Sequence, residues 1–164
     1  MLFKYPIRVF IFSVFLMAVA GSTVQCQAQF SAPEASASSI PEPDRMQAAA
    51  LAKMLGGHNA DGPLVLQVGS RVMFAQAHIS GSEYAGPGSQ AAGLHLLESK
   101  VVSVGKNKLI VIYCGCCPWT RCPNVAPAYK RLRELGFTNV KVLYIPHNFG
   151  DDWAGKGFPM AHGE

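Results

Sequence analysis

The chain has 164 residues, of which 49% are hydrophobic and 15% charged, and a formal net charge of +4. This length has room for one ordinary domain and not for two. No run of basic residues alternates with aromatic ones, so a nucleic-acid partner has little support.

Residues 1–20 have the features of an export signal. An apolar run over residues 9–16 follows a short basic region, and Ala18-Val19-Ala20 fits the small-residue rule for cleavage. The run is too short for a comfortable membrane span, which leaves an uncleaved anchor as the lesser alternative. Cleavage as late as residue 28 also fits the sequence. We expect an exported protein, periplasmic or secreted, with no membrane contact once the signal is removed.

The rest of the chain predicts a linker followed by one domain. Residues 21–44 are rich in Ser, Ala and Pro, with almost nothing to bury, which predicts a disordered linker before a domain over residues 45–164 with its core at 62–160. The patterns predict helices over 45–55, 71–77, 90–100 and 125–135, a short helix within 148–158, and strands over 64–68, 109–113 and 140–145. Because strands alternate with helices, we expect an α/β fold with a central parallel sheet flanked by helices on both faces.

A cysteine-rich loop follows the most apolar of these strands. Residues 109–113 form a β-branched run typical of a strand buried on both faces. Four of the five cysteines of the chain come within the next nine residues: Cys114, Cys116, Cys117 and Cys122. Backbone N–H groups of a loop and of a helix start can hold an anion near a sulfur atom. They would also lower the pKa of a strand-end thiol such as that of Cys114.

Three stretches, in this order, resemble a rhodanese-like domain over roughly residues 62–160. They are the strand 64–68 with the turn His78-Ile79-Ser80-Gly81, then Ile112-Tyr113-Cys114 with the helix that ends at Gly136, and finally Trp153 with Gly157-Phe158-Pro159. The resemblance implies the fold expected above. It also implies the family's chemistry, in which a cysteine thiolate takes up a sulfane sulfur atom as a persulfide and passes it to a nucleophile.

The resemblance leaves the catalytic nucleophile open between two cysteines. Cys114 matches the family's cysteine by its place directly after the strand, whereas Arg121 stands at the family's spacing from Cys116. Arg121, Gly115 and Trp119 are expected to bind the substrate, with packing of Trp119 against the loop as the stronger alternative for that side chain.

The loop also departs from the family. It is longer, and Gln67 and Gly69 stand where the family has an acidic and a basic residue. The additional thiols Cys117 and Cys122 are expected to act as redox or resolving groups, or else to form a local structural disulfide.

We therefore expect sulfur transfer from a thiosulfate-like donor to a thiophilic acceptor through a cysteine persulfide, with no cofactor and no metal. The partner would be a small sulfur-containing anion or a thiol, and the oligomeric state is left open. A thiol–disulfide redox or sensing protein on the same fold is the first alternative. A non-catalytic module that binds a soft metal or a partner is the second.

Overall fold

The computed structural model describes residues 37–57 and 62–163. All of them belong to one compact unit, 33–164. The predicted export signal over residues 1–20 lies outside the described residues, as does most of the predicted linker. Among the described residues, no helix is long and apolar enough to cross a membrane.

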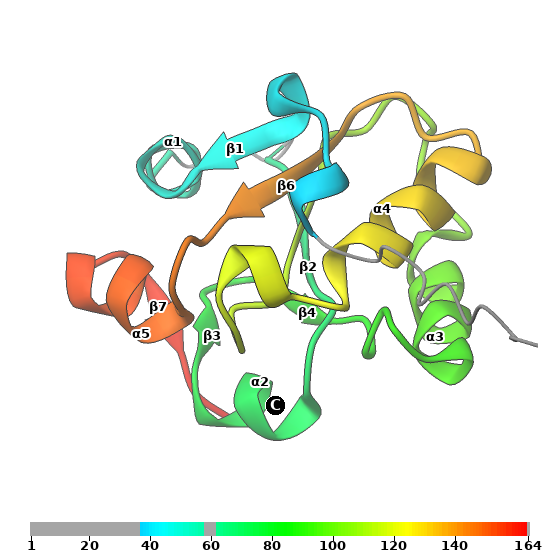
Figure 1. Cartoon of the computed structure of the whole chain (residues 1–164). Helices are drawn as coiled ribbons and strands as arrows, with labels where there is room; N and C mark the ends of the chain where they lie inside the picture. The colour runs from blue at the N-terminus through cyan, green and yellow to red at the C-terminus, as the bar shows by residue number, and fades with distance from the viewer. Residues whose placement is uncertain (1–36, 58–61, 164) are drawn as a thin grey trace, which may run out of the picture. The chain divides into compact units, whose positions relative to one another are not determined.

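A five-stranded sheet forms the centre of the fold (Figure 1). Its strands lie in the order β1-β6-β5-β2-β4, and each adjacent pair is parallel. They span Arg45–Gln47 (β1), Val140–Tyr144 (β6), Ile110–Tyr113 (β5), Leu64–Gln67 (β2) and Glu83–Tyr84 (β4). The middle of the sheet is apolar on both faces, because every residue of β5 is buried. Parallel sheets covered on both sides have such continuous apolar strands.

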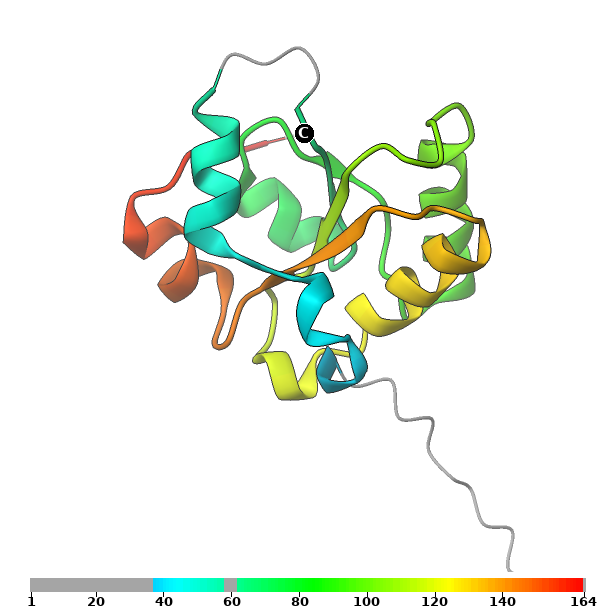
Figure 2. The same cartoon turned by 90° about the horizontal axis from the view of Figure 1, so that it is seen from above.

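Helices cover both faces of this sheet, which confirms the predicted α/β architecture (Figure 2). The helices α3 (Ala91–Val101) and α4 (Val125–Glu134) pack on one core, to which β5 contributes Ile110 and Ile112. The helices α1 (Ala48–Leu55) and α5 (Phe149–Asp152) pack on the other core, to which β5 contributes Val111 and Tyr113. The period of two along the strand thus divides its side chains between two apolar layers.

The prediction of a disordered linker up to residue 44 is wrong for its last eight residues. Two short 3₁₀ helices, Ala37–Ser39 (η1) and Glu42–Asp44 (η2), precede β1 there. Their order comes from a few contacts that an average over composition misses: Ala37 and Ile40 are 0% and 1% exposed. The first helix also begins at Ala48, because Arg45–Gln47 pairs with β6 as a strand.

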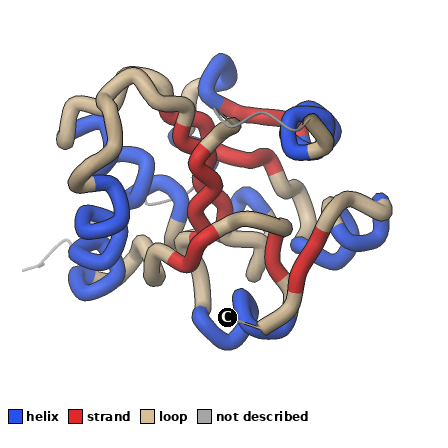
Figure 3. The backbone as a smooth tube through the Cα atoms, turned by 180° about the vertical axis from the view of Figure 1, so that it is seen from behind, coloured by secondary structure: helices blue, strands red, loops and turns tan. Residues whose placement is uncertain are grey.

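The remaining elements are short and surround one end of the sheet (Figure 3). They include the helix α2 (Arg71–Gln76), the 3₁₀ helices η3 (Trp119–Arg121) and η4 (Ala154–Lys156), and an antiparallel pair formed by β3 (His78–Ile79) and β7 (Met160–Ala161). The indole N–H of Trp153 donates to the carbonyl of Pro159 at 2.9 Å and holds the C-terminal turn against the core.

Candidate active site

The cysteine-rich loop leaves the sheet from its central strand. Cys114 comes directly after β5, and the chain then turns at Gly115, whose φ is +73°. Only glycine takes this left-handed conformation without strain, and a Cβ at this position would stand 3.0 Å from the Cβ of Phe149. The Gly115 carbonyl accepts the Phe149 N–H at 2.9 Å. The turn that separates Cys114 from Cys116 is therefore fixed by the start of α5.

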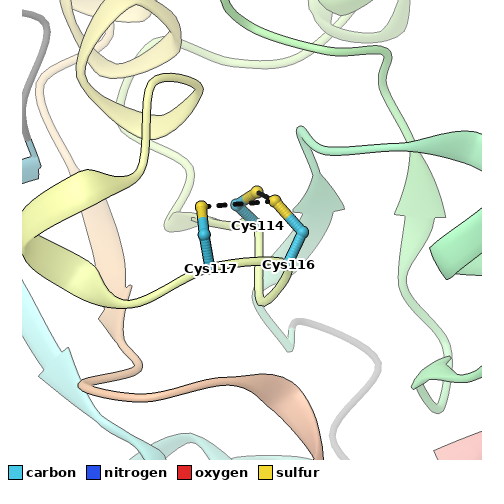
Figure 4. A group of neighbouring side chains, drawn as sticks. All are labelled: Cys114, Cys116 and Cys117. Carbon is cyan, nitrogen blue, oxygen red and sulfur yellow. Dashed lines mark hydrogen bonds between the residues drawn. The ribbon is translucent and has the colours of Figure 1, made fainter.

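Three sulfur atoms of this loop lie together and point toward one another (Figure 4). The Sγ atoms of Cys114 and Cys116 are 2.8 Å apart, and those of Cys116 and Cys117 are 3.4 Å apart. All three sulfurs fall within 4.8 Å of one another. Cys122 lies outside this group, in the same buried core cluster as Cys114. The four cysteines of the loop are free thiols in this structure.

These thiols differ sharply in their access to solvent. Cys114 and Cys122 are 5% and 4% exposed, whereas Cys117 is half-buried and Cys116 is exposed. A sulfur donor from solution therefore meets Cys116 before it meets Cys114. Position after the strand favoured Cys114 as the nucleophile, but exposure favours Cys116.

Hydrogen bonds also distinguish Cys116, because they lower its pKa and contribute to raising those of Cys114 and Cys117. The thiol of Cys114 donates to Cys116 and, with further donors in Cys117 and the Asn124 amide, lowers the pKa of Cys116 to about 6. The same interaction raises the pKa of Cys114 well above its usual range, helped by Cys122 and by burial. Burial, with a hydrogen bond to Cys116, raises the pKa of Cys117 to about 12. Cys116 is thus the exposed thiolate of the loop at neutral pH.

The start of α4 acts on a different sulfur from the one we expected. The hydrogen bond from Cys114, together with the backbone N–H groups of Asn124 and Val125, lowers the pKa of Cys122 to about 6. The expected activation of Cys114 by these amides is therefore wrong. Because Cys114 has a single S–H proton, it can serve only one of Cys116 and Cys122 at a time.

Asn124 is a site residue that the sequence did not reveal. It stands immediately before α4 but does not cap the helix with its side chain. Instead, its amide nitrogen donates to the Cys114 sulfur at 3.4 Å and lies 4.0 Å from the Cys116 sulfur. Its amide oxygen accepts the N–H and the O–H of Ser89 at 3.1 and 2.8 Å. Ser89 thereby orients the Asn124 amide with its N–H groups toward the sulfurs.

Gln67 and Gly69 support Cys114 from β2 and from the turn that follows it. The Gln67 side chain donates to the Cys114 carbonyl at 3.3 Å and accepts the Gly69 N–H at 3.1 Å. A Cβ on Gly69 would lie 2.9 Å from the Cys114 sulfur. The two departures from the family's first-strand pattern therefore meet at the buried thiol.

A cavity of about 300 Å³ opens beside the exposed thiolate. Cys116 lines it together with apolar side chains and neutral amides, among them Met73, Gln76, Asn148, Phe149 and Ala154. No Arg, Lys, His, Asp or Glu side chain is among the described residues that line it. The cavity can therefore hold a small, largely uncharged group next to the Cys116 sulfur.

The structure does not bring Arg121 and Trp119 into this cavity. Trp119 is 7% exposed, and its ring packs edge-on against Tyr144 with the centroids 5.0 Å apart. The Arg45 guanidinium lies 5.7 Å from the same indole ring. Arg121 is exposed and does not line the cavity. Trp119 thus packs against the core, and the cavity beside Cys116 has neither an arginine nor an indole in its described lining.

Comparison with known proteins identifies the fold. No protein-family model and no curated protein matches the chain. The rhodanese-like domain of Alr3790 from Anabaena sp. is 21% identical, with a TM-score of 0.53 over 73% of this chain and 79% of that one. The BH2092 protein of Bacillus halodurans is 20% identical, with a TM-score of 0.56 over 72% and 76%. A cysteine-persulfide form of EanB with ergothioneine is 21% identical, with a TM-score of 0.52 over 72% of this chain and 28% of that one. The parallel sheet, the helices on both of its faces and these similar structures together show that the chain has the rhodanese-like fold.

Proposed function

We propose that this protein transfers sulfane sulfur through a persulfide on Cys116. The observation that carries the proposal is an exposed cysteine, at the wall of a cavity, whose pKa neighbouring donors lower to about 6. Thiolates and not thiols are the nucleophiles of cysteine chemistry. A pKa of about 6 keeps Cys116 in the reactive form at neutral pH.

The reaction would proceed in two displacements at sulfur. The Cys116 thiolate attacks the sulfane sulfur of the donor, the bond from that sulfur to the rest of the donor breaks, and the leaving group takes the electron pair. The Cys114 thiol and the Asn124 amide hold the attacking sulfur as hydrogen-bond donors. A thiol or another thiophilic acceptor then attacks the outer sulfur of the persulfide and restores the Cys116 thiolate.

The cavity argues for a donor that carries little charge when it enters. A doubly negative thiosulfate ion would enter a cavity without a cationic side chain among its described lining residues. An ion left without a partner in such surroundings loses hydration that nothing replaces. We propose a sulfane donor that can enter in a neutral form, such as the protonated form of an alkyl hydropersulfide, in place of the thiosulfate-like donor that the sequence suggested.

Intact-mass spectrometry of the reduced, full-length protein tests the proposal. In samples taken immediately after mixing, we expect Cys116 to carry one added sulfur atom, gained faster from benzyl hydropersulfide than from thiosulfate, and to lose it when cyanide is added. Cys116→Ser should remain unmodified, whereas Cys26→Ser, outside the described residues, should react as the unaltered protein does. A Cys116→Ser protein that gains sulfur at the same rate would refute Cys116 as the nucleophile.

A soft-metal site is a second candidate function, favoured by one observation. The Cys114, Cys116 and Cys117 sulfurs lie within 4.8 Å of one another, and clustered thiolates suit Cu(I) and Zn²⁺. Metal analysis of the purified protein separates the two functions. Copper or zinc in a one-to-one ratio, with Cys116 protected from alkylation, would favour metal binding over sulfur transfer.

We also propose that the protein acts outside the cytoplasm. The support is the signal-like sequence of residues 1–20. Cell fractionation with an antibody against the protein tests this, and the mass of the exported form identifies the cleavage site. A full-length chain found only in the cytoplasm would contradict the proposal.

A further inference from the structure

The thiol that the proposed transfer leaves without a reaction of its own is Cys114. It is 5% exposed, and its sulfur lies 2.8 Å from that of Cys116. We propose that Cys114 resolves the Cys116 persulfide, so that the two cysteines form a disulfide and the outer sulfur leaves as hydrosulfide. This inference rests on the proposed function, because it needs the persulfide to form first. It adds a second activity, the reduction of sulfane sulfur to sulfide.

Distance makes Cys114 the resolving thiol. A disulfide bond is about 2.05 Å long, so the two sulfurs must approach by less than about 1 Å from their present separation of 2.8 Å. The Cys117 sulfur is farther from Cys116, at 3.4 Å, and a bridge between adjacent cysteines would strain the chain. One glycine separates Cys114 from Cys116, and its left-handed conformation turns the two side chains toward each other.

The step balances without an oxidant. The Cys114 sulfur attacks the inner sulfur of the persulfide, which is the Cys116 Sγ, and forms the Cys114–Cys116 bond. The bond between the inner and the outer sulfur breaks, and the outer sulfur takes its electron pair together with the proton of the Cys114 thiol. The sulfane sulfur is reduced by two electrons to hydrosulfide while the two cysteines become one disulfide. A dithiol reductant must then reduce that disulfide before the next cycle.

Loading of Cys116 with sulfur also prepares Cys114 for this attack. The leading cause of the raised pKa of Cys114 is the hydrogen bond that its thiol donates to Cys116. The inner sulfur of a persulfide is no longer a thiolate, so this hydrogen bond weakens and the proton of Cys114 leaves more readily. The Cys114 thiol is thus a weak nucleophile while Cys116 is a thiolate, and it becomes a better nucleophile once Cys116 carries the added sulfur.

The cavity gives the departing sulfur a place next to the reacting pair. Both Cys114 and Cys116 line it, so the outer sulfur of the persulfide can lie in the cavity while the Cys114 sulfur approaches from its buried position. Asn124 donates to the Cys114 sulfur and lies near the Cys116 sulfur, which keeps the two atoms adjacent throughout.

A single-turnover experiment on the reduced, full-length protein tests the inference. The protein is freed of reductant and mixed with one equivalent of benzyl hydropersulfide. Released hydrosulfide is trapped with a bimane reagent, and the protein is analysed by intact mass and peptide mapping. We expect about one equivalent of hydrosulfide per protein and a Cys114–Cys116 disulfide. Cys114→Ser should keep the added sulfur on Cys116 and release no hydrosulfide, and Cys114→Ala guards against an effect of the serine hydroxyl.

The possible outcomes separate this inference from the proposed function. An unaltered protein that gains sulfur and keeps it would overturn the inference and leave the proposed function intact. A Cys114→Ser protein that releases hydrosulfide as fast as the unaltered one, while Cys117→Ser retains its persulfide, would assign resolution to Cys117 and overturn the inference. A protein that never gains sulfur in any of these variants would refute both.

Discussion

Asn124→Asp is the sharpest test of the thiolate at Cys116. The substitution keeps the size of the side chain and the oxygen that accepts the Ser89 N–H and O–H, but it replaces the amide donor by a carboxylate 4.0 Å from the Cys116 sulfur. Two like charges at about 4 Å repel by about 4 kcal/mol at an effective dielectric constant of about 20. Because Cys116 faces solvent, we reduce this figure by about half, which corresponds to a rise in the pKa of Cys116 of about 1–2 units.

The assay is the rate at which iodoacetamide alkylates Cys116, followed by peptide mapping between about pH 4 and pH 10. In the unaltered protein the rate should rise through a midpoint near the pKa of about 6. In Asn124→Asp the midpoint should lie near about pH 7–8, so that alkylation at about pH 5 becomes at least about tenfold slower. Asn139→Asp, which adds the same charge on an exposed position before β6, should leave the midpoint unchanged. An unchanged midpoint in Asn124→Asp would show that the Asn124 amide does not stabilise the Cys116 thiolate.

Three further predictions concern the stability of the folded protein. Gly69→Ala places a Cβ 2.9 Å from the Cys114 sulfur. It should lower the free energy of unfolding, measured in urea, by about 1–3 kcal/mol. Gly105→Ala is the matched control, because its Cβ meets nothing nearer than 3.4 Å. Trp119→Ala should cost about 3–5 kcal/mol of stability, because it removes a buried ring that packs on Tyr144; a weakened affinity for the sulfur donor at unchanged stability would instead indicate substrate stacking. Hydrogen bonds from Tyr129 and Lys141 lower the pKa of Asp44, so its stabilising effect is present above the unfolded pKa and is lost as the pH falls through the folded one. Asp44→Asn should therefore flatten the loss of stability between about pH 5 and pH 2, and an equally steep loss in urea titrations would speak against this contribution.

The sheet was predictable because its main strands have clear local patterns. The runs at residues 64–68, 109–113 and 140–145 are predominantly apolar, and each forms a largely buried strand. The strands β4 and β7 have two residues each, too few for any periodicity to appear. The ordered segment before β1 was missed for a related reason: two buried side chains, Ala37 and Ile40, fix a stretch whose composition is otherwise that of a linker.

The candidate site was predictable in its sulfur atoms and not in their surroundings. The four clustered cysteines mark the loop by themselves, but the contact of Ser89 with Asn124 joins residues 35 positions apart and leaves no local pattern. Arg121 and Trp119 were expected to bind the substrate, with packing of Trp119 against the loop as the stronger alternative. The 3₁₀ helix η3 turns the indole ring into the core, because Tyr144 and Arg45 offer it packing partners. Which way a short loop helix points depends on what packs beneath it.

The short N-terminal segment joins the thiol loop to the chain that precedes it. Ile40 belongs to the same apolar core as Trp119 and Cys122, and the Arg45 guanidinium donates to the Ile40 carbonyl at 2.7 and 2.9 Å while it lies against the Trp119 ring. A change in the position of residues 37–45 would consequently alter the packing of η3, which carries Trp119 in the loop.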